Sequence, residues 1–189
     1  MRVIAGKFRS RQLRSLPGLD LRPTADRLRE TLFNVLTAGN PPALEGTVWV
    51  DLYAGTGAVG IEAVSRGASM VYFVELSGRA AELTKQNLAS LGIGTSFQIL
   101  KQDSIRALRG LELSAAVPDF IFLDPPYEME KAYIQTMSSL AQSRMLKPET
   151  IVIAEHPKTF DPGQDFAPLH RYRQLVQGDV ALSFYRKAQ

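Results

Sequence analysis

The chain has 189 residues, enough for one domain with a sizeable core and too few for two comfortable ones. Its 45% hydrophobic and 22% charged residues are typical of a globular protein, which excludes a disordered or fibrous chain. There is no cysteine, no apolar run of membrane-helix length and no apolar signal-peptide core at the basic start. We therefore expect a cytoplasmic protein without disulfides or a membrane partner. A metal site is not expected either, since His156 and His170 are the only histidines.

Positive charge is concentrated at the start of the chain. Residues 1–30 carry eight basic and three acidic side chains, a net charge of +5, whereas the other 159 residues carry 14 basic and 16 acidic ones, a net charge of −2. A basic segment on a slightly acidic body indicates a polyanionic partner, although a solvated tail explains the charge equally well. The candidate residues for binding such a partner are Arg2, Lys7, Arg9, Arg11, Arg14, Arg22 and Arg27.

The first predicted elements are an arm and a helix. Apolar and basic residues alternate over residues 1–23, which predicts a β-hairpin or an extended arm. Thr24 can cap a helix over about 25–38, because four leucine and valine residues there fall on one face. We expect residues 1–40 to form a basic N-terminal extension and residues 41–189 to form the main domain.

Strands and helices then alternate along the chain. Apolar runs predict strands at 47–52, 70–75, 97–100, 119–123 and 151–155. Helical patterns between them cover about 59–66, 77–91, 104–111 and 129–143. Such alternation is typical of parallel strands with crossover helices on both faces of a sheet. A hairpin of residues 171–177 and 180–187 adds two strands at one edge. The prediction is an α/β fold with a seven-stranded, mostly parallel, doubly wound sheet.

A glycine-rich loop, Asp51 to Gly60, follows the first predicted strand. Glycines allow a tight turn and close approach to a ligand, and the start of the next helix offers free N–H groups. Glu75 lies at the end of the second strand, where a carboxylate can accept ribose hydroxyls, and Asp103 follows the third strand. The loop and these acids should therefore line one cleft at the edge of the sheet.

Two cofactors fit this pattern. A nicotinamide dinucleotide also uses a G-x-G-x-x-G loop with an acid about 20 residues further on. Asp51 favours S-adenosylmethionine, because a carboxylate pointing into the loop repels a pyrophosphate and attracts an ammonium group. Asp51 could instead brace the loop, since aspartate is common in turns.

The tetrapeptide Asp124-Pro125-Pro126-Tyr127 follows the fourth predicted strand. Ligands of open α/β sheets bind where the strand order reverses, which places this tetrapeptide beside the glycine loop. The exocyclic amine of a base is a poor nucleophile. Acceptors such as the Asp124 carboxylate and the Pro125 carbonyl can favour a pyramidal nitrogen, while Tyr127 can stack on the base. A simple strand-to-helix turn is the alternative. The pattern predicts methylation of an amine.

The chain resembles the bacterial 16S ribosomal RNA guanine-N2 methyltransferases that modify guanine 966 of the small subunit. The resemblance covers nearly the whole length. The Asp-Pro-Pro-Tyr motif is shared by amino-methyltransferases of DNA, RNA and protein, whereas the segment Arg22-Pro-Thr-Ala-Asp-Arg-Leu-Arg-Glu30 is far more specific. Further matching segments are 2–9, 51–68, 73–75, 123–127 and 178–185.

The resemblance implies a Rossmann-like, class I methyltransferase that uses S-adenosylmethionine and no metal. Its substrate would be 16S rRNA in the small ribosomal subunit or an assembly intermediate, and the enzyme would be a monomer. The implied cofactor-binding residues are Asp51, Tyr53, Gly55, Gly57, Glu75 and Asp103. The implied catalytic residues are Asp124, Pro125 and Tyr127. Ser77 departs from the family pattern, because an acid is expected there.

Three alternatives stay open at this point. The chain could be a DNA or protein amino-methyltransferase, an NAD-dependent oxidoreductase, or a catalytically silent RNA-binding module. Among other residues, Trp49 is expected in the core and Asn87 in a hydrogen bond between a helix and a loop. His156 is expected in a loop after the fifth strand, which ends at Glu155.

Overall fold

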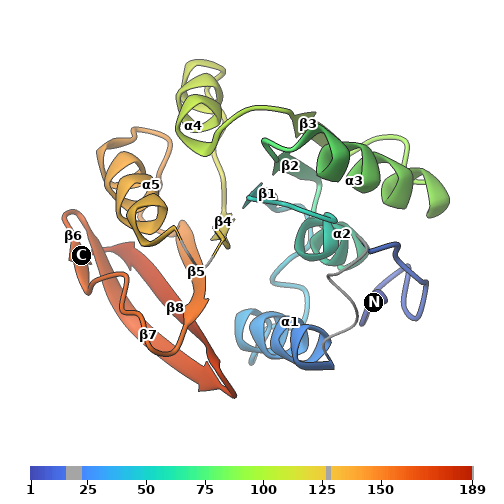
Figure 1. The fold of residues 1–189 in the computed structure, drawn as a ribbon, viewed down its shortest axis with the longest axis horizontal. Helices are drawn as coiled ribbons and strands as arrows, with labels where there is room; N and C mark the ends of the chain where they lie inside the picture. Colours follow the sequence, from blue (N-terminus) through green and yellow to red (C-terminus); the bar gives the residue numbers. More distant parts are fainter. Residues whose placement is uncertain (16–22, 127–128, 189) are drawn as a thin grey trace.

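The computed structural model describes residues 1–15, 23–126 and 129–188. Its strands form one sheet in the order β3-β2-β1-β4-β5-β8-β7-β6 (Figure 1). The five strands from β3 to β5 are parallel to one another, and β8, β7 and β6 follow as antiparallel neighbours. The strands are β1 Val48–Leu52, β2 Met70–Val74, β3 Phe97–Leu100, β4 Phe120–Leu123, β5 Ile151–Pro157, β6 Asp165–Phe166, β7 Leu169–Gln177 and β8 Val180–Lys187.

Helices cover both faces of the sheet, as the alternation of elements predicts. Figure 1 shows α1, α2 and α3 on one face and α4 and α5 on the other. The helices are α1 Pro23–Leu36, α2 Ala58–Ser65, α3 Gly78–Ser90, α4 Ser104–Leu113 and α5 Glu130–Gln142. None of the helices in the described ranges has the length and apolar character needed to cross a bilayer.

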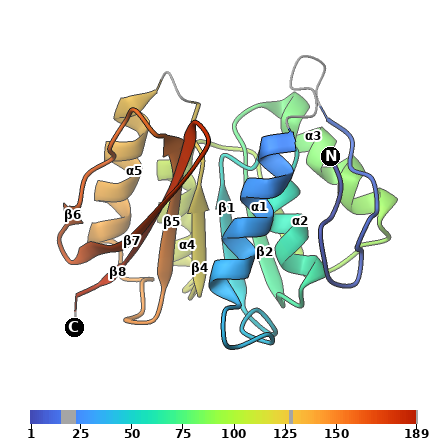
Figure 2. The same cartoon turned by 90° about the horizontal axis from the view of Figure 1, so that it is seen from below.

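The core on the α1 face is built around Trp49. This residue of β1 is fully buried and stacks between Phe33 of α1 and Phe120 of β4, with ring centroids 5.3 and 4.9 Å away. The prediction that Trp49 belongs to the core is therefore confirmed. Val3 and Leu13 of the N-terminal segment are buried in the same core. Residues 1–15 thus pack on the body of the protein, beside α2 and α3 (Figure 2).

The N-terminal segment has the hairpin form that its residue alternation predicts. Arg2 and Gln12 make an antiparallel bridge, and the N–H groups of Val3 and Ser10 donate to the carbonyl oxygens of Arg11 and Val3. Two other predictions need correction. The sheet has eight strands, and the additional strand β6 is only two residues long, too short to leave a periodic pattern.

The second correction concerns the end of β5. The sequence ends this strand at Glu155 and places His156 in a loop, but β5 continues to Pro157 because β8 pairs with it from Val152 to Pro157. His156 is buried, and its Nε2 lies 2.9 Å from Oγ of Ser183 in β8. A proline normally ends a strand. Pro157 occupies the last position of β5, where its missing N–H costs little.

Candidate active site

The loop between β1 and α2 makes a tight turn. Tyr53, Gly55 and Gly57 have positive φ angles of 64°, 57° and 78°. A Cβ atom on Gly57 would lie 2.7 Å from Cγ2 of Thr84 in α3, so this position accepts only glycine without displacement. Thr84 also donates from Oγ1 to the carbonyl oxygen of Gly55 at 2.9 Å. The loop is therefore held in place by α3.

Asp51 lies in β1 beneath this loop and is 1% exposed. Its Oδ2 accepts a hydrogen bond from the backbone N–H of Gly60 at 2.9 Å, which joins β1 to the first turns of α2. Burial is the main cause that raises the pKa of Asp51 to about 7. The charges of Asp124 and Glu75 raise this pKa as well, whereas the hydrogen bond from Gly60 lowers it. Three carboxyl groups thus interact at one end of the sheet.

Glu75 follows β2 and connects the glycine loop to α3. Its Oε2 accepts from the N–H of Gly55 at 2.8 Å, and its Oε1 accepts from the N–H of Ser77 at 2.7 Å. A carboxylate offers about four acceptor positions, so both oxygens can still accept ribose hydroxyls. Ser77, where an acid was expected, caps α3 by accepting a hydrogen bond from the N–H of Ala80.

Two further predicted cofactor residues have structural partners. Asp103 is exposed and caps α4, with its Oδ1 accepting from the N–H of Arg106 at 2.9 Å. The hydroxyl of Tyr53 lies 2.8 Å from the side-chain oxygens of both Ser104 and Thr136. The phenol group of Tyr53 therefore ties β1 to α4 and α5, and its backbone forms part of the glycine loop.

Asp124 emerges next to the glycine loop because β4 pairs with β1. The last Cα partners of these strands are Leu52 and Leu123. Burial raises the pKa of Asp124 well above its usual range, and the charge of Glu155 raises it further. The carbonyl oxygen of Pro125 accepts a hydrogen bond from the Tyr133 hydroxyl at 3.3 Å. The remaining predicted catalytic residue, Tyr127, lies outside the described residues.

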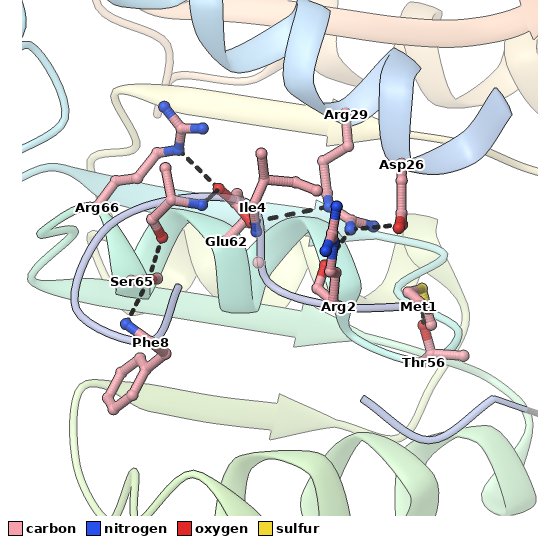
Figure 3. Close-up of polar contacts among 12 residues, drawn as sticks. Met1, Arg2, Ile4, Phe8, Asp26, Arg29, Thr56, Glu62, Ser65 and Arg66 are labelled. Atoms are coloured by element: carbon pink, nitrogen blue, oxygen red, sulfur yellow. Dashed lines mark hydrogen bonds and ion pairs between the residues drawn. The ribbon is translucent and has the colours of Figure 1, made fainter. Parts of the chain in front are cut away.

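The N-terminal segment is attached to α2 by the buried carboxylate of Glu62 (Figure 3). Its Oε2 accepts from the N–H of Ile4 at 2.7 Å, and its Oε1 accepts from the N–H of Ala5 at 2.9 Å. Arg66 donates from Nε to Oε1 at 2.8 Å, and Arg29 of α1 lies with its Nε 3.8 Å from Oε2. One carboxylate thus joins the segment, α1 and α2.

A second attachment runs through Asn87 of α3. Its side chain accepts from the N–H of Arg14 at 2.8 Å and donates to the carbonyl oxygen of Arg14 at 3.1 Å. The predicted role of Asn87 in a hydrogen bond to a loop is confirmed. The roles of Glu62 and Tyr133 were missed. A signal existed for Glu62, because it is the only charged residue in the otherwise apolar helix α2.

The candidate RNA-binding residues separate into two groups. Arg2, Arg9 and Arg27 line one hollow of about 430 Å³ between the N-terminal segment and α1. The other lining residues are Ile4, Ser10, Asp26 and Glu30. Asp26 forms an ion pair with Arg29 at 2.9 Å, so its charge is partly balanced. The three arginines therefore give this hollow a positive charge.

The second group has partners within the protein. Arg11 donates to the carbonyl oxygen of Ser90 at 3.3 Å, and Arg14 donates to the side chain of Gln86 at 3.0 Å. The Lys7 ammonium group lies 5.4 Å from the centre of the Phe8 ring. The last candidate, Arg22, falls outside the described residues.

The sheet order, the hairpin that closes it and the glycine loop beside Asp124-Pro125 define a Rossmann-like fold of the methyltransferase class. The chain belongs to the family described as "Conserved hypothetical protein 95", whose model matches residues 1–186.

Relatives of known name agree with this class. The chain is 36% identical over 159 residues to "Ribosomal RNA small subunit methyltransferase D" of Haemophilus influenzae, covering 84% of this chain and 79% of the relative. It is 32% identical over 187 residues to "Putative rRNA methyltransferase YlbH" of Bacillus subtilis, covering 99% of both chains. Among solved structures, "Putative methyltransferase yhhF" of Escherichia coli superposes with a TM-score of 0.80 at 28% identity, over 99% of this chain and 97% of that one.

Proposed function

We propose that this protein transfers a methyl group from S-adenosylmethionine to the exocyclic N2 amine of a guanine in 16S rRNA, with guanine 966 as the expected target. The observation that carries the proposal is the placement of Asp124 and Pro125 beside the glycine loop. These elements are joined by the paired strands β1 and β4, whose ends meet at Leu52 and Leu123. Relatives named as ribosomal RNA methyltransferases support RNA as the substrate.

The acidic residues of the site fit the charge of this cofactor. Asp51 interacts with both Glu75 and Asp124, and no ion pair joins any of the three to a basic side chain within the described part of the chain. Such a group of carboxyls favours a ligand with positive charge. S-adenosylmethionine has an ammonium and a sulfonium group, whereas the pyrophosphate of NAD would be repelled. The site therefore favours the methyl donor.

Each residue has a defined task in this proposal. Asp51 would attract the ammonium group, and Glu75 would accept the ribose hydroxyls. The cofactor supplies an electrophilic methyl group at its sulfonium centre. Asp124 and the Pro125 carbonyl would accept hydrogen bonds from the guanine amine and hold its lone pair in line with that methyl group. The hydrogen bond from Tyr133 fixes the orientation of the Pro125 carbonyl.

The proposal is tested with labelled S-adenosylmethionine and small ribosomal subunits that lack the modification. Methyl transfer, followed by mapping of the labelled nucleotide and its N2 position, is the expected result. Asp124→Asn should reduce the rate by about 10²–10⁴-fold while leaving the affinity for S-adenosylhomocysteine intact. Asp161→Asn, at an exposed aspartate, serves as the matched control.

Other outcomes would point elsewhere. Labelling of naked 16S rRNA, DNA or protein in parallel identifies the substrate class, and transfer only to DNA or protein would contradict the proposal. Calorimetric binding of NAD without binding of S-adenosylhomocysteine would exclude methyl transfer altogether. Sedimentation of the free protein checks the expected monomer.

A further inference from the structure

Glu155 stands next to Asp124, just beyond the point where the pairing between β4 and β5 ends. In the parallel pair β4 and β5 the last Cα partners are Leu123 and Ala154. Asp124 and Glu155 are the next residues on the two strands. Side chains alternate between the faces of a sheet, so both point away from the face that Leu123 and Ala154 occupy. The charge of Glu155 acts on Asp124, which agrees with this arrangement.

Two further acids lie close to this pair. Asp51 approaches Asp124 from β1, and Glu75, which follows β2, acts on Asp51 in turn. On the other side of β5, the Cα partner of Glu155 in β8 is Leu182. From α5, the Tyr133 hydroxyl contacts the carbonyl oxygen of Pro125. Two adjacent carboxyl groups that are partly removed from solvent repel each other when both are ionised, so such a pair tends to hold one shared proton.

We infer that Glu155 is a positioning residue which, through Asp124, enables the site to take up the proton released when the amine is methylated. This inference rests on the proposed function. The amine nitrogen forms a bond to the methyl carbon as the bond from that carbon to sulfur breaks, and the electron pair of that bond stays on sulfur. The nitrogen then carries a positive charge and one proton in excess. Asp124 accepts this proton, which leaves a neutral methylated amine.

The role of Glu155 follows from the charges before and after transfer. Before transfer, a cationic ligand beside the pair favours the ionised form of Asp124, which can accept an N–H from the amine. During transfer the positive charge moves from the sulfur to the amine nitrogen. It then leaves the nitrogen together with the released proton. Glu155 stays ionised and stabilises the protonated form of Asp124. The total charge of the site is the same at both stages, so no uncompensated charge develops.

The first test needs no cofactor. Protein labelled with ¹³C at the aspartate carboxyl carbons is titrated by NMR, and Asp124→Asn identifies the Asp124 signal. In Glu155→Gln the titration midpoint of Asp124 should fall by roughly one pH unit, because a neighbouring negative charge is removed. Glu149→Gln, an exposed acid just before β5, is the control and should leave the midpoint unchanged. An unchanged midpoint in Glu155→Gln would overturn the inference.

The second test measures single-turnover methyl transfer to RNA against pH. In Glu155→Gln the acidic limb of the pH–rate profile should move to lower pH by the same amount as the NMR titration midpoint of Asp124. The plateau rate should fall by roughly tenfold. Glu155→Asp should restore part of the plateau, and S-adenosylhomocysteine affinity and thermal unfolding serve as folding controls. A lower rate with an unmoved pH profile would reduce Glu155 to a structural role. If the unmodified protein methylates no RNA, the proposed function fails, whereas the NMR titration still decides whether the carboxyl pair exists.

Discussion

The side-chain amide of Asn87 donates a hydrogen bond to the carbonyl oxygen of Thr56 at 2.9 Å. Thr56 lies in the glycine loop, and the same amide group also binds Arg14 of the N-terminal segment. A single buried side chain therefore connects the proposed cofactor loop with the segment that carries most of the candidate RNA-binding residues. The two parts of the site share one support, although they lie far apart in the sequence.

Asn87→Ala should weaken both binding of S-adenosylhomocysteine and the folded state. The change leaves partly buried backbone groups of Thr56 and Arg14 without their partner, at a cost of about 1–3 kcal/mol in unfolding free energy. Urea unfolding and calorimetry measure the two effects. Gln86→Ala is the matched control, because Gln86 is an exposed neighbour that contacts Arg14 only at its guanidinium. Equal effects of the two substitutions would refute this role of Asn87.

The raised pKa of Asp51 predicts that the ligand-free protein becomes less stable as the pH rises. The pKa of Asp51 is about 7 in the folded state, compared with 3.8 for an unperturbed aspartate side chain. Between these values the folded state binds more protons than the unfolded state, so the stability that the proton provides is lost as the pH rises through 7. Urea unfolding at pH 5, 6, 7 and 8 should show this loss, of the order of 2–4 kcal/mol.

Asp51→Asn should flatten that pH dependence. His156 makes stability increase with pH, because burial lowers its pKa. This contribution is the same in the variant and in the unmodified protein. The difference between the variant and the unmodified protein therefore isolates Asp51. Asp179→Asn is the control, since the hydrogen bond from Lys158 lowers the pKa of the exposed Asp179 and this carboxyl group therefore titrates below this pH range. Parallel curves for Asp51→Asn and the unmodified protein would contradict the assignment.

Much of the fold follows from local patterns, because most residues in the strands of the parallel sheet are apolar. The parallel strands, the intervening helices and the β7–β8 hairpin are confirmed, with ends that differ by a few residues. The glycine loop was found because its backbone needs glycine. The attachment of the N-terminal segment could not be predicted, since Glu62 contacts Ile4 across 58 positions of sequence. The continuation of β5 through His156 likewise depends on its pairing with β8.

Glu62→Gln should destabilise the protein strongly. The carboxylate is fully buried, and its neutralisation leaves the guanidinium group of Arg66 without its counter-charge and that of Arg29 with Asp26 alone. Removal of one partner of a buried ion pair lowers the free energy of unfolding by about 3–5 kcal/mol, which urea unfolding can measure. Hydrogen exchange at the amides of Ile4 and Ala5 should also accelerate. Glu82→Gln, at an exposed position of α3, should change stability by less than about 0.5 kcal/mol.

The hollow between the N-terminal segment and α1 predicts which arginines contact RNA phosphates. The double substitution Arg2→Ala and Arg9→Ala should weaken RNA binding and reduce the slope of log K against log salt by about 1.4–1.8. The control is the double substitution Arg109→Ala and Arg144→Ala, which removes the same charge from the opposite face of the sheet. Arg109 is an exposed residue of α4, and Arg144 is an exposed residue that follows α5. Filter binding at several salt concentrations compares them. Equal slopes for the two double variants would show that net charge alone governs binding.

The attachment of residues 1–15 also sets an order of events during synthesis. Ile4 and Ala5 leave the ribosome long before Glu62, their partner 58 and 57 positions later. The segment can dock only after β1, the glycine loop and α2 have formed, because contacts between distant residues wait for the chain that separates them. The arginines of the hollow are thus fixed only in a chain whose loop for the methyl donor is already built. A nascent chain that ends before α2 lacks the carboxylate that holds the backbone of Ile4 and Ala5, so its N-terminal segment has no such attachment.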